Sequence, residues 1–281
     1  MTLAVTAVSG QLGAAIARQL LTMNLDQQVI GLARNPEKVT DLDMEIRKGD
    51  FGDPAGLERS LQGVDTVLMV SLNGAPDERI GLHRNLIDAA RAAGVKKIVY
   101  TSVQGADDNN SFSPIIQSNR QTEADVRDSG MAWSIGRNGI YIEPDVEYIE
   151  SYIAAGEIAN SAGEGRCGYT SRPELAVAYA QMMLDDAHIG QTYFLHGPLL
   201  TQAQLTGHLN DAFDASLVYR PMTKAEYLAD RTAELGDFLG TVIAGIYEGI
   251  HDGLLDRPSD FEKAAGRPHQ SWENYFSKLK N

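Results

Sequence analysis

The sequence has a single cysteine and no long run of apolar residues, and each shortage excludes a class of protein. Cys167 is the only cysteine among 281 residues, so an intramolecular disulfide framework and a metal site built from several cysteines are excluded. We expect Cys167 to be a packed cysteine rather than a reactive thiol. No stretch approaches the roughly 20 apolar residues that a membrane helix needs, so no membrane insertion is expected.

The start of the chain is not expected to be a secretory leader. Residues 1–10 have no basic segment and no cleavage signature, and they run directly into an expected strand. We therefore expect a cytoplasmic protein.

Basic residues are fewer than acidic ones. The chain has 24 Lys and Arg against 38 Asp and Glu, which gives a formal net charge of −14. Such a surface repels the phosphates of nucleic acids and of anionic membranes, so no nucleic-acid partner is expected. The cationic residues that could meet an anionic cofactor are correspondingly easy to single out.

Several catalytic signatures are also missing. None of the eleven tyrosines has a lysine four residues later, although short-chain reductases use that pair to donate a proton. The most similar spacing is Tyr227 with Arg231. The histidines have neither an i, i+4 spacing nor a cysteine neighbour, so no metal site is predicted. The sequence contains neither a Gly-x-Ser-x-Gly elbow nor a phosphate-binding Gly-Lys-Ser/Thr.

Apolar strands alternate with amphipathic helices through the first half of the chain. The patterns predict strands at residues 3–8, 28–33, 44–48, 66–70, 97–101 and 132–136, and helices at residues 11–23, 54–61, 78–93 and 119–129. This alternation predicts an α/β fold, a Rossmann-type doubly wound parallel sheet.

The second half is more helical, with helices expected at residues 174–184, 201–214, 224–235 and 238–251 and a strand at residues 192–195. We therefore predict an NAD(P)-binding domain at residues 1–140. Residues 141–281 would form a smaller, mostly helical substrate lobe with segments returning to the main sheet.

A glycine-containing loop joins the first expected strand to the first expected helix. Gly10 and Gly13 lie three residues apart as the helix begins. In a first β-α-β unit, such glycines let the backbone approach a dinucleotide's diphosphate and let the helix pack closely on the sheet. A glycine turn without a ligand is the alternative.

The end of the second expected strand indicates which dinucleotide binds. NAD sites place Asp or Glu there, whereas an arginine suits the 2′-phosphate of NADP. Arg34 stands at this point with no acid at the strand tip, so NADP(H) is favoured; an ordinary surface arginine is the alternative. Topology places Asp50 and Phe51, after the third strand, near the adenine.

A nicotinamide site without an obvious acid suits an acceptor such as a quinone, because its reduced oxygens can take protons from water. The leading hypothesis is therefore an NADPH-dependent reductase of quinones or similar flat acceptors. The alternative is an NADP(H)-binding redox sensor that acts through a protein partner without turnover. The sequence does not decide whether the chain forms a homo-oligomer.

The ordered set of short motifs resembles the NmrA-like atypical short-chain reductases, most of all their bacterial NADPH:quinone oxidoreductases. The resemblance covers nearly the whole chain, and the segments that carry it are residues 6–13, 33–38, 62–65, 83–85, 90–96, 100–102, 137–139 and 266–269.

The resemblance implies a role for each of several residues. The diphosphate would be contacted by Ala7, Val8, Ser9, Gly10, Gln11 and Leu12, and the 2′-phosphate by Arg34. The ribose and nicotinamide side would be lined by Ser71, Leu72 and Asn73. The floor between nicotinamide and substrate would be formed by Asn138, Gly139, Ile140, Tyr141, Ile142 and Glu143. Asn138 is the catalytic candidate that would orient the acceptor, and Arg172 would close over the site. Arg172 could instead be only a helix-start residue, and Asn138-Gly139 only a turn.

Three positions depart from the family pattern. Ala7 stands where the family usually has glycine, and Ser71-Leu72-Asn73 stands where it has a serine-rich stretch. Phe51 stands where the family commonly has an aromatic residue that carries a hydroxyl group. These changes could alter the substrate, or weaken catalysis while leaving binding intact.

Overall fold

A parallel sheet of seven strands forms the centre of the molecule in the computed structural model, which describes residues 1–23, 25–105, 110 and 112–280. The strand order is β10-β6-β5-β4-β1-β2-β3, and every neighbouring pair is parallel. The strands are β1 (Thr2–Thr6), β2 (Gln28–Ala33), β3 (Glu45–Lys48), β4 (Thr66–Met69), β5 (Lys97–Val103), β6 (Ala132–Asn138) and β10 (Gln191–Leu195). This order confirms the predicted Rossmann-type fold.

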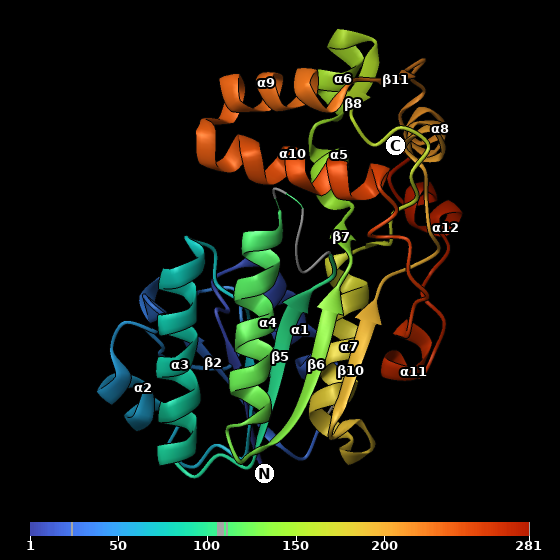
Figure 1. Ribbon diagram of the computed structural model, residues 1–281. Coiled ribbons are helices and arrows are strands. Elements are labelled where there is room, and N and C mark those ends of the chain that lie inside the picture. The colour runs from blue at the N-terminus through green and yellow to red at the C-terminus, as the bar shows by residue number, and fades with distance from the viewer. Residues whose placement is uncertain (24, 106–109, 111, 281) are drawn as a thin grey trace.

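Helices cover both faces of the sheet (Figure 1). Those on one face are α2 (Pro54–Ser60), α3 (Pro76–Ala92) and α4 (Ser113–Arg127), and those on the other are α1 (Gln11–Thr22), α7 (Arg172–Leu184) and α11 (Phe261–Ala265). Alternate residues of β1 supply the two cores, since Leu3 and Val5 pack towards α1 and α7 while Ala4 packs towards α2 and α3. The central strands are buried on both faces, as parallel strands in such folds are.

Two helix starts show how the sequence sets the boundaries. At the start of α2, the side chain of Asp53 accepts a hydrogen bond from the Gly56 N–H, and Pro54 follows it. Helix α4 begins at Ser113 rather than at Asn119 as expected. Pro114 lies in its first turn, where its missing N–H leaves no helical hydrogen bond unmade, so the helix extends further towards the N-terminus.

Most of the second half forms a separate lobe above the carboxyl ends of the strands (Figure 1). Its elements are β7 (Ile140–Tyr141), α5 (Glu143–Glu147), α6 (Ile149–Ala155), β8 (Glu157–Asn160), β9 (Tyr169–Thr170), α8 (Gln202–Phe213), β11 (Val218–Pro221), α9 (Lys224–Leu235), α10 (Asp237–His251) and α12 (Trp272–Ser277). Two short 3-10 helices lie at Pro36–Lys38 and Asp186–His188. Strand β10 pairs with β6 and α7 packs on α1, so these later segments belong to the sheet layers. The division at residue 140 stays a prediction.

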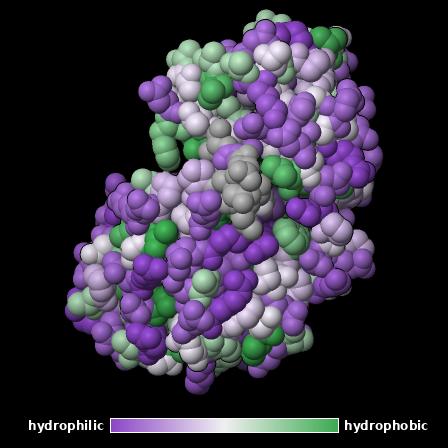
Figure 2. Space-filling model, viewed as in Figure 1, coloured by the Kyte–Doolittle hydropathy of each residue, from purple (hydrophilic) through white to green (hydrophobic). Residues whose placement is uncertain are grey.

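Hydrophilic residues predominate on the face of the molecule that Figure 2 shows. The same view shows a hollow between the lobe and the sheet domain. Across the described ranges, the structure has no helix long and apolar enough to cross a membrane. Cys167 is free and fully buried, as expected for a packed cysteine.

One carboxyl group is enclosed in the core of the lobe. Asp145 of α5 is 5% exposed and accepts a hydrogen bond from the Tyr152 hydroxyl at 3.2 Å. The other groups that interact with it electrostatically are the side chains of Cys167, Tyr169, Tyr227 and Tyr247. Burial raises the pKa of Asp145 from 3.8 to about 7, because a charge in this apolar site loses its hydration.

This burial predicts a pH-dependent stability that Asp145→Asn should remove. The folded chain keeps a proton on Asp145 that the unfolded chain loses above pH 3.8. The contribution of Asp145 to the free energy of unfolding is therefore greatest below about pH 4 and falls as the pH rises to about 7. Asparagine still accepts from Tyr152 and does not titrate. At pH 8 the variant should be more stable by on the order of 2 to 4 kcal/mol, and at pH 4 the two proteins should be similar. Thermal unfolding across this range measures the difference, and a difference independent of pH would contradict the assignment.

Candidate cofactor and substrate site

The carboxyl ends of β1 and β4 mark the point where the sheet's strand order reverses. From β1 the chain proceeds to β2 and β3 on one side and returns to β4, β5 and β6 on the other. In open α/β sheets, ligands bind in the crevice at this point. The loops that follow these strands contain most of the predicted site residues.

The loop after β1 makes a tight turn at Ala7. Ala7 has φ of +52°, a left-handed conformation that glycine adopts without strain. Its carbonyl oxygen accepts a hydrogen bond from the Gly10 N–H at 2.9 Å. A Cβ on Gly13 would meet the Ala7 carbonyl group, lying 2.7 Å from its carbon, and would lie 2.8 Å from the Thr6 oxygen. Gly13 therefore permits α1 to start directly against the end of β1.

The N-terminus of α1 is open to a ligand. Gly10 is its N-cap without a side-chain hydrogen bond, and the first turn contains no acidic residue. The first N–H groups of a helix have no partner within it and favour an anion. Ser9, Gly10 and Gln11 are exposed there, whereas Val8 and Leu12 are buried beneath them. The residues of this turn thus fit the diphosphate of a dinucleotide.

Arg34 and Asp50 lie at the other end of the crevice, after β2 and β3. Arg34 is exposed and follows β2 directly. It has no hydrogen bond or ion pair within the described part of the chain, so its guanidinium is available to an anion. Asp50 is half-buried and accepts from the Gly52 N–H at 2.9 Å. Phe51 is only 5% exposed and packs in the core under α2 and α3.

The segment after β4 is held by buried polar side chains. The Ser71 N–H donates to the Thr101 hydroxyl at 2.9 Å, and the Leu72 N–H donates to His83 Nε2 at 3.1 Å. Ser71 and Leu72 are half-buried, and Asn73 is exposed. Because these two N–H groups are used internally, Ser71 and Leu72 can offer a ligand only their carbonyl oxygens and side chains.

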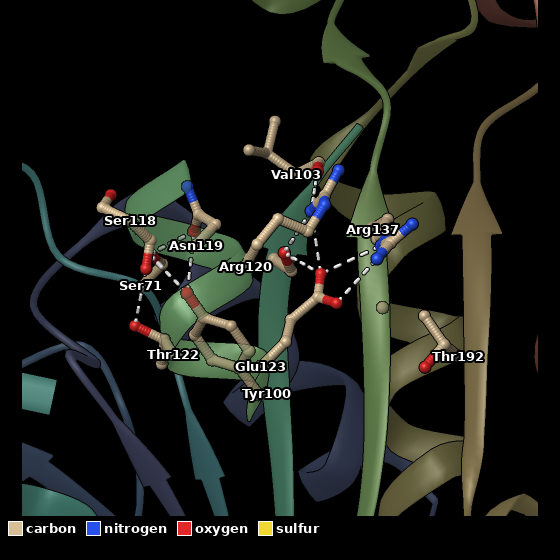
Figure 3. Close-up of polar contacts among 12 residues, drawn as sticks. Ser71, Tyr100, Val103, Ser118, Asn119, Arg120, Thr122, Glu123, Arg137 and Thr192 are labelled. Carbon is tan, nitrogen blue, oxygen red and sulfur yellow. Dashed lines mark hydrogen bonds and ion pairs between the residues drawn. The ribbon is translucent and has the colours of Figure 1, made fainter. Parts of the chain in front are cut away.

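Arg79 fixes the Ser71 hydroxyl from below. Arg79 is 4% exposed and donates to Ser71 Oγ at 2.7 Å, to Ser118 Oγ at 2.8 Å and to Asn119 Oδ1 at 3.2 Å. The Tyr100 hydroxyl donates to the same Asn119 oxygen at 2.7 Å. Figure 3 shows Ser71, Tyr100, Ser118 and Asn119 converging between α4 and β5. Burial lowers the pKa of Arg79, yet an arginine stays protonated.

A carboxylate surrounded by three arginines joins the ends of β5, β6 and α4. Glu123 is fully buried, and its oxygens accept from Arg137 at 2.9 and 2.7 Å, from Arg120 at 2.8 Å and from Arg127 at 3.1 Å. Figure 3 shows the contacts from Arg137 and Arg120. The Ser102 hydroxyl donates to the same carboxylate at 2.7 Å. Burial raises the pKa of Glu123, but the hydrogen bonds from Arg137 and the charge of Arg120 outweigh it and hold the pKa below its usual value. The carboxylate thus fixes the strand end that precedes Asn138.

The predicted floor residues meet at the ends of β6 and β7. Asn138 is 4% exposed, and its Oδ1 accepts from the Tyr179 hydroxyl at 2.5 Å while its Nδ2 donates to the Tyr141 hydroxyl at 3.3 Å. The guanidinium of Arg172 lies 5.0 Å from the centre of the Tyr141 ring. The Arg172 N–H donates to Glu143 Oε1 at 2.7 Å.

Gly139 and Ile140 continue this floor, with backbone N–H groups that donate to Leu195 and Gly168. Tyr141 packs against the apolar cluster that contains Val8 and Leu12. The floor and the glycine turn therefore share one core. Arg172 is also the first residue of α7, and its closing over the site stays a prediction.

Site residues differ in how readily they could give up a proton. Burial lowers the pKa of His83 to about 3, so the imidazole is neutral, and burial raises the pKa of Tyr100 to about 12. Burial also raises the pKa of Tyr141 and of Glu143. The neutral His83 and the two phenols are weak proton donors at neutral pH. In the ranges that the structure describes, no group of histidine, cysteine and acidic side chains could hold a metal ion.

Four functional neighbours were not predicted from the sequence: Arg79, Asn119, Glu123 and Tyr179. They lie on helices that turn polar side chains inward beneath the loops. In the sequence, a buried arginine on a helix cannot be told from an exposed one. His83 and Arg137 lie in segments that carry the family resemblance, and they were the only sequence signals for these buried polar residues.

Ala7→Gly and Gly13→Ala should change stability in opposite directions. Glycine relieves the left-handed strain at Ala7 but also increases the conformational entropy of the unfolded chain. On balance, we expect the free energy of unfolding to rise by about 0.5 to 1 kcal/mol. Alanine at Gly13 must displace the Ala7 carbonyl group, so we expect a loss of at least about 2 kcal/mol and weaker dinucleotide binding. Chemical denaturation measures both values. A destabilised Ala7→Gly variant would contradict the strain assigned to this turn.

Comparison with known proteins agrees with this geometry. Residues 8–185 match a family model described as NAD(P)H-binding. Quinone oxidoreductase 2 of Escherichia coli K12 is 31% identical over 285 residues, covering 99% of each chain. A crystal structure of the E. coli NADPH-dependent quinone oxidoreductase complexed with NADPH superimposes with a TM-score of 0.90 at 30% identity over 100% of both chains. An NmrA-like family oxidoreductase of Aspergillus flavus is 25% identical, covering 89% of this chain and 85% of the relative. The chain therefore belongs to the NAD(P)H-binding family, with E. coli quinone oxidoreductase 2 among its relatives.

Proposed function

We propose that the protein uses NADPH to reduce quinones or similar flat electron acceptors by direct hydride transfer. The observation that carries this proposal is the line of site residues along the carboxyl edge of the sheet. Arg34 stands free at one end, the open helix N-terminus lies in the middle, and Tyr141 with Arg172 lies at the other end. The similarity to E. coli quinone oxidoreductase 2 supports the same class of acceptor.

The preference for NADP(H) over NAD(H) rests on Arg34. Its planar guanidinium suits a phosphate, and no carboxylate within the described ranges neutralises it. The residues Ala7 to Leu12 would lie under the diphosphate, and Asp50 would lie near the adenine. Ser71, Leu72 and Asn73 would line the ribose and nicotinamide side.

We assign Asn138 a positioning role in place of direct contact with the acceptor. Both ends of its amide are engaged, by Tyr179 and by Tyr141, and its side chain is buried. It would hold the Tyr141 ring at the floor, where Arg172 covers it. Gly139 and Ile140 would complete the floor beside it.

The reaction asks little of the protein beyond orientation. NADPH, when bound, supplies a hydride with its electron pair to the acceptor. The side chains hold the reacting faces together and exclude water from between them. The reduced oxygens then take their protons from solvent, which accords with the weakly acidic Tyr141 and the neutral His83.

Turnover is the first test of this proposal. The purified protein mixed with NADPH and a small benzoquinone should oxidise NADPH, as followed by the loss of nicotinamide absorbance, with one hydroquinone formed per NADPH consumed. Absence of oxidation across quinones, dyes and carbonyls would refute the enzymatic function. Tight NADPH binding without oxidation, together with a protein partner recovered on pull-down, would instead support the redox-sensing alternative.

Arg34→Ala tests the cofactor preference. Loss of a charged contact to the 2′-phosphate should weaken NADPH binding by about 10- to 100-fold, whereas NADH binding should change by less than about threefold. Arg91→Ala is a matched control, because Arg91 is an exposed arginine in the last turn of α3, at the opposite end of that helix from the site. Calorimetric titration of both cofactors measures the change. Equal losses for NADPH and NADH would place the 2′-phosphate elsewhere.

A further inference from the structure

An apolar groove lies where the lobe overhangs the starts of α3 and α4. Pro76 of α3 and Pro114 and Ile115 of α4 form one wall, and Phe238, Thr241 and Val242 of α10 form the other. Its volume is about 380 Å³, within the range of small-molecule sites. Figure 1 shows the start of α10 above the tops of these helices, and Figure 2 shows the hollow on this side of the molecule.

The groove lies next to the expected nicotinamide end of the site. Asn119 links the two, because its Oδ1 accepts from Ser71 at 3.2 Å and its Nδ2 donates to the Ile115 carbonyl at 2.9 Å. Pro76, the first residue of α3, lies three residues after Asn73 in the sequence. The groove and the segment after β4 therefore both border the starts of α3 and α4, where an elongated ligand seated beside Ser71 would reach the groove.

The groove has large apolar side chains open to solvent. Phe238 is 58% exposed at the start of α10, although such a ring is normally covered in a folded chain. Val242, one helical turn further on, and Ile115 across the groove are half-buried. An apolar group placed between them would cover this surface and gain the free energy of its burial.

The charged residue that lines the groove is acidic, and two more acidic residues begin α3. Asp237 lines it, and Asp77 and Glu78 follow Pro76 in the first turn of α3. Among the described lining residues there is no lysine or arginine. A negatively charged substituent would therefore be repelled, while an uncharged apolar one would not.

We propose that this groove binds an apolar side chain of the acceptor that carries no negative charge, so that the natural acceptor is a ring with a hydrophobic tail and not a bare ring. The proposal rests on the proposed reductase function. The reacting ring would lie beside Ser71 and Tyr141, and the tail would lie between Phe238 and Ile115.

Two quinones with the same ring test the groove. The pair is 2,3-dimethoxy-5-methyl-1,4-benzoquinone and its derivative with a decyl tail, used below its aggregation concentration. For the wild-type protein, kcat/KM should be at least about tenfold higher with the tail. A tail of the same length that ends in a carboxylate should lose most of this gain.

Phe238→Ala should reduce the advantage of the decyl tail by about fivefold and leave the tail-less quinone unchanged. Leu239→Ala is the matched control, since Leu239 is 47% exposed on the same turn but does not line the groove. It should leave both quinones unchanged. An equal tail advantage in wild type and Phe238→Ala would overturn the proposal.

Binding separates this inference from the reductase function itself. The affinity of the tailed and tail-less quinones for the NADP⁺-loaded protein can be measured by calorimetry whether or not turnover occurs. If neither quinone is reduced, the reductase function fails. If the tailed quinone binds no more tightly than the tail-less one, or if Phe238→Ala does not weaken its binding, the groove assignment fails.

Discussion

The close contact between the start of α1 and the end of β1 is the constraint on which the candidate site depends. Because Gly13 has no side chain, the helix can begin against the carbonyl groups of Thr6 and Ala7. This contact directs the uncapped first turn of α1 at the crevice where the strand order reverses. It also makes Ala7 take the left-handed conformation, so the chain accepts local strain at the point that would face the cofactor.

A second layer of buried polar groups holds the remaining loops. Arg79 and His83 fix the segment after β4, and Glu123 with its arginines fixes the ends of β5 and β6. None of these groups needs to touch a ligand to act, because each orients a loop that could. A site held by side chains on helices and strands keeps its geometry more closely than one built on loops alone.

The fold and the first-turn residues were predictable from the sequence for a physical reason. Strand and helix periodicity, the Gly10-Gly13 spacing and the position of Arg34 are local signals, and the topology rules for parallel sheets assemble them in one way. The packing of Arg79, Asn119 and Tyr179 is not local, since each contacts residues from another element. Asn138 shows the same limit: its place in the floor was predicted, but its burial between Tyr179 and Tyr141 depends on how α7 returns to the sheet.

The lobe connects the cofactor end of the molecule to the surface that an acceptor would meet. Its helix α10 overhangs the starts of α3 and α4, and those helices follow the loops at the sheet edge. We expect one dinucleotide to lie along this edge from Arg34 to Tyr141. A crystal structure of the protein soaked with NADPH would show its position. The diphosphate oxygens should lie about 3 Å from the N–H groups at the start of α1, the 2′-phosphate on Arg34 and the nicotinamide beside Tyr141. A cofactor whose 2′-phosphate lies away from Arg34, or whose diphosphate does not touch the Gly10 turn, would contradict this expectation.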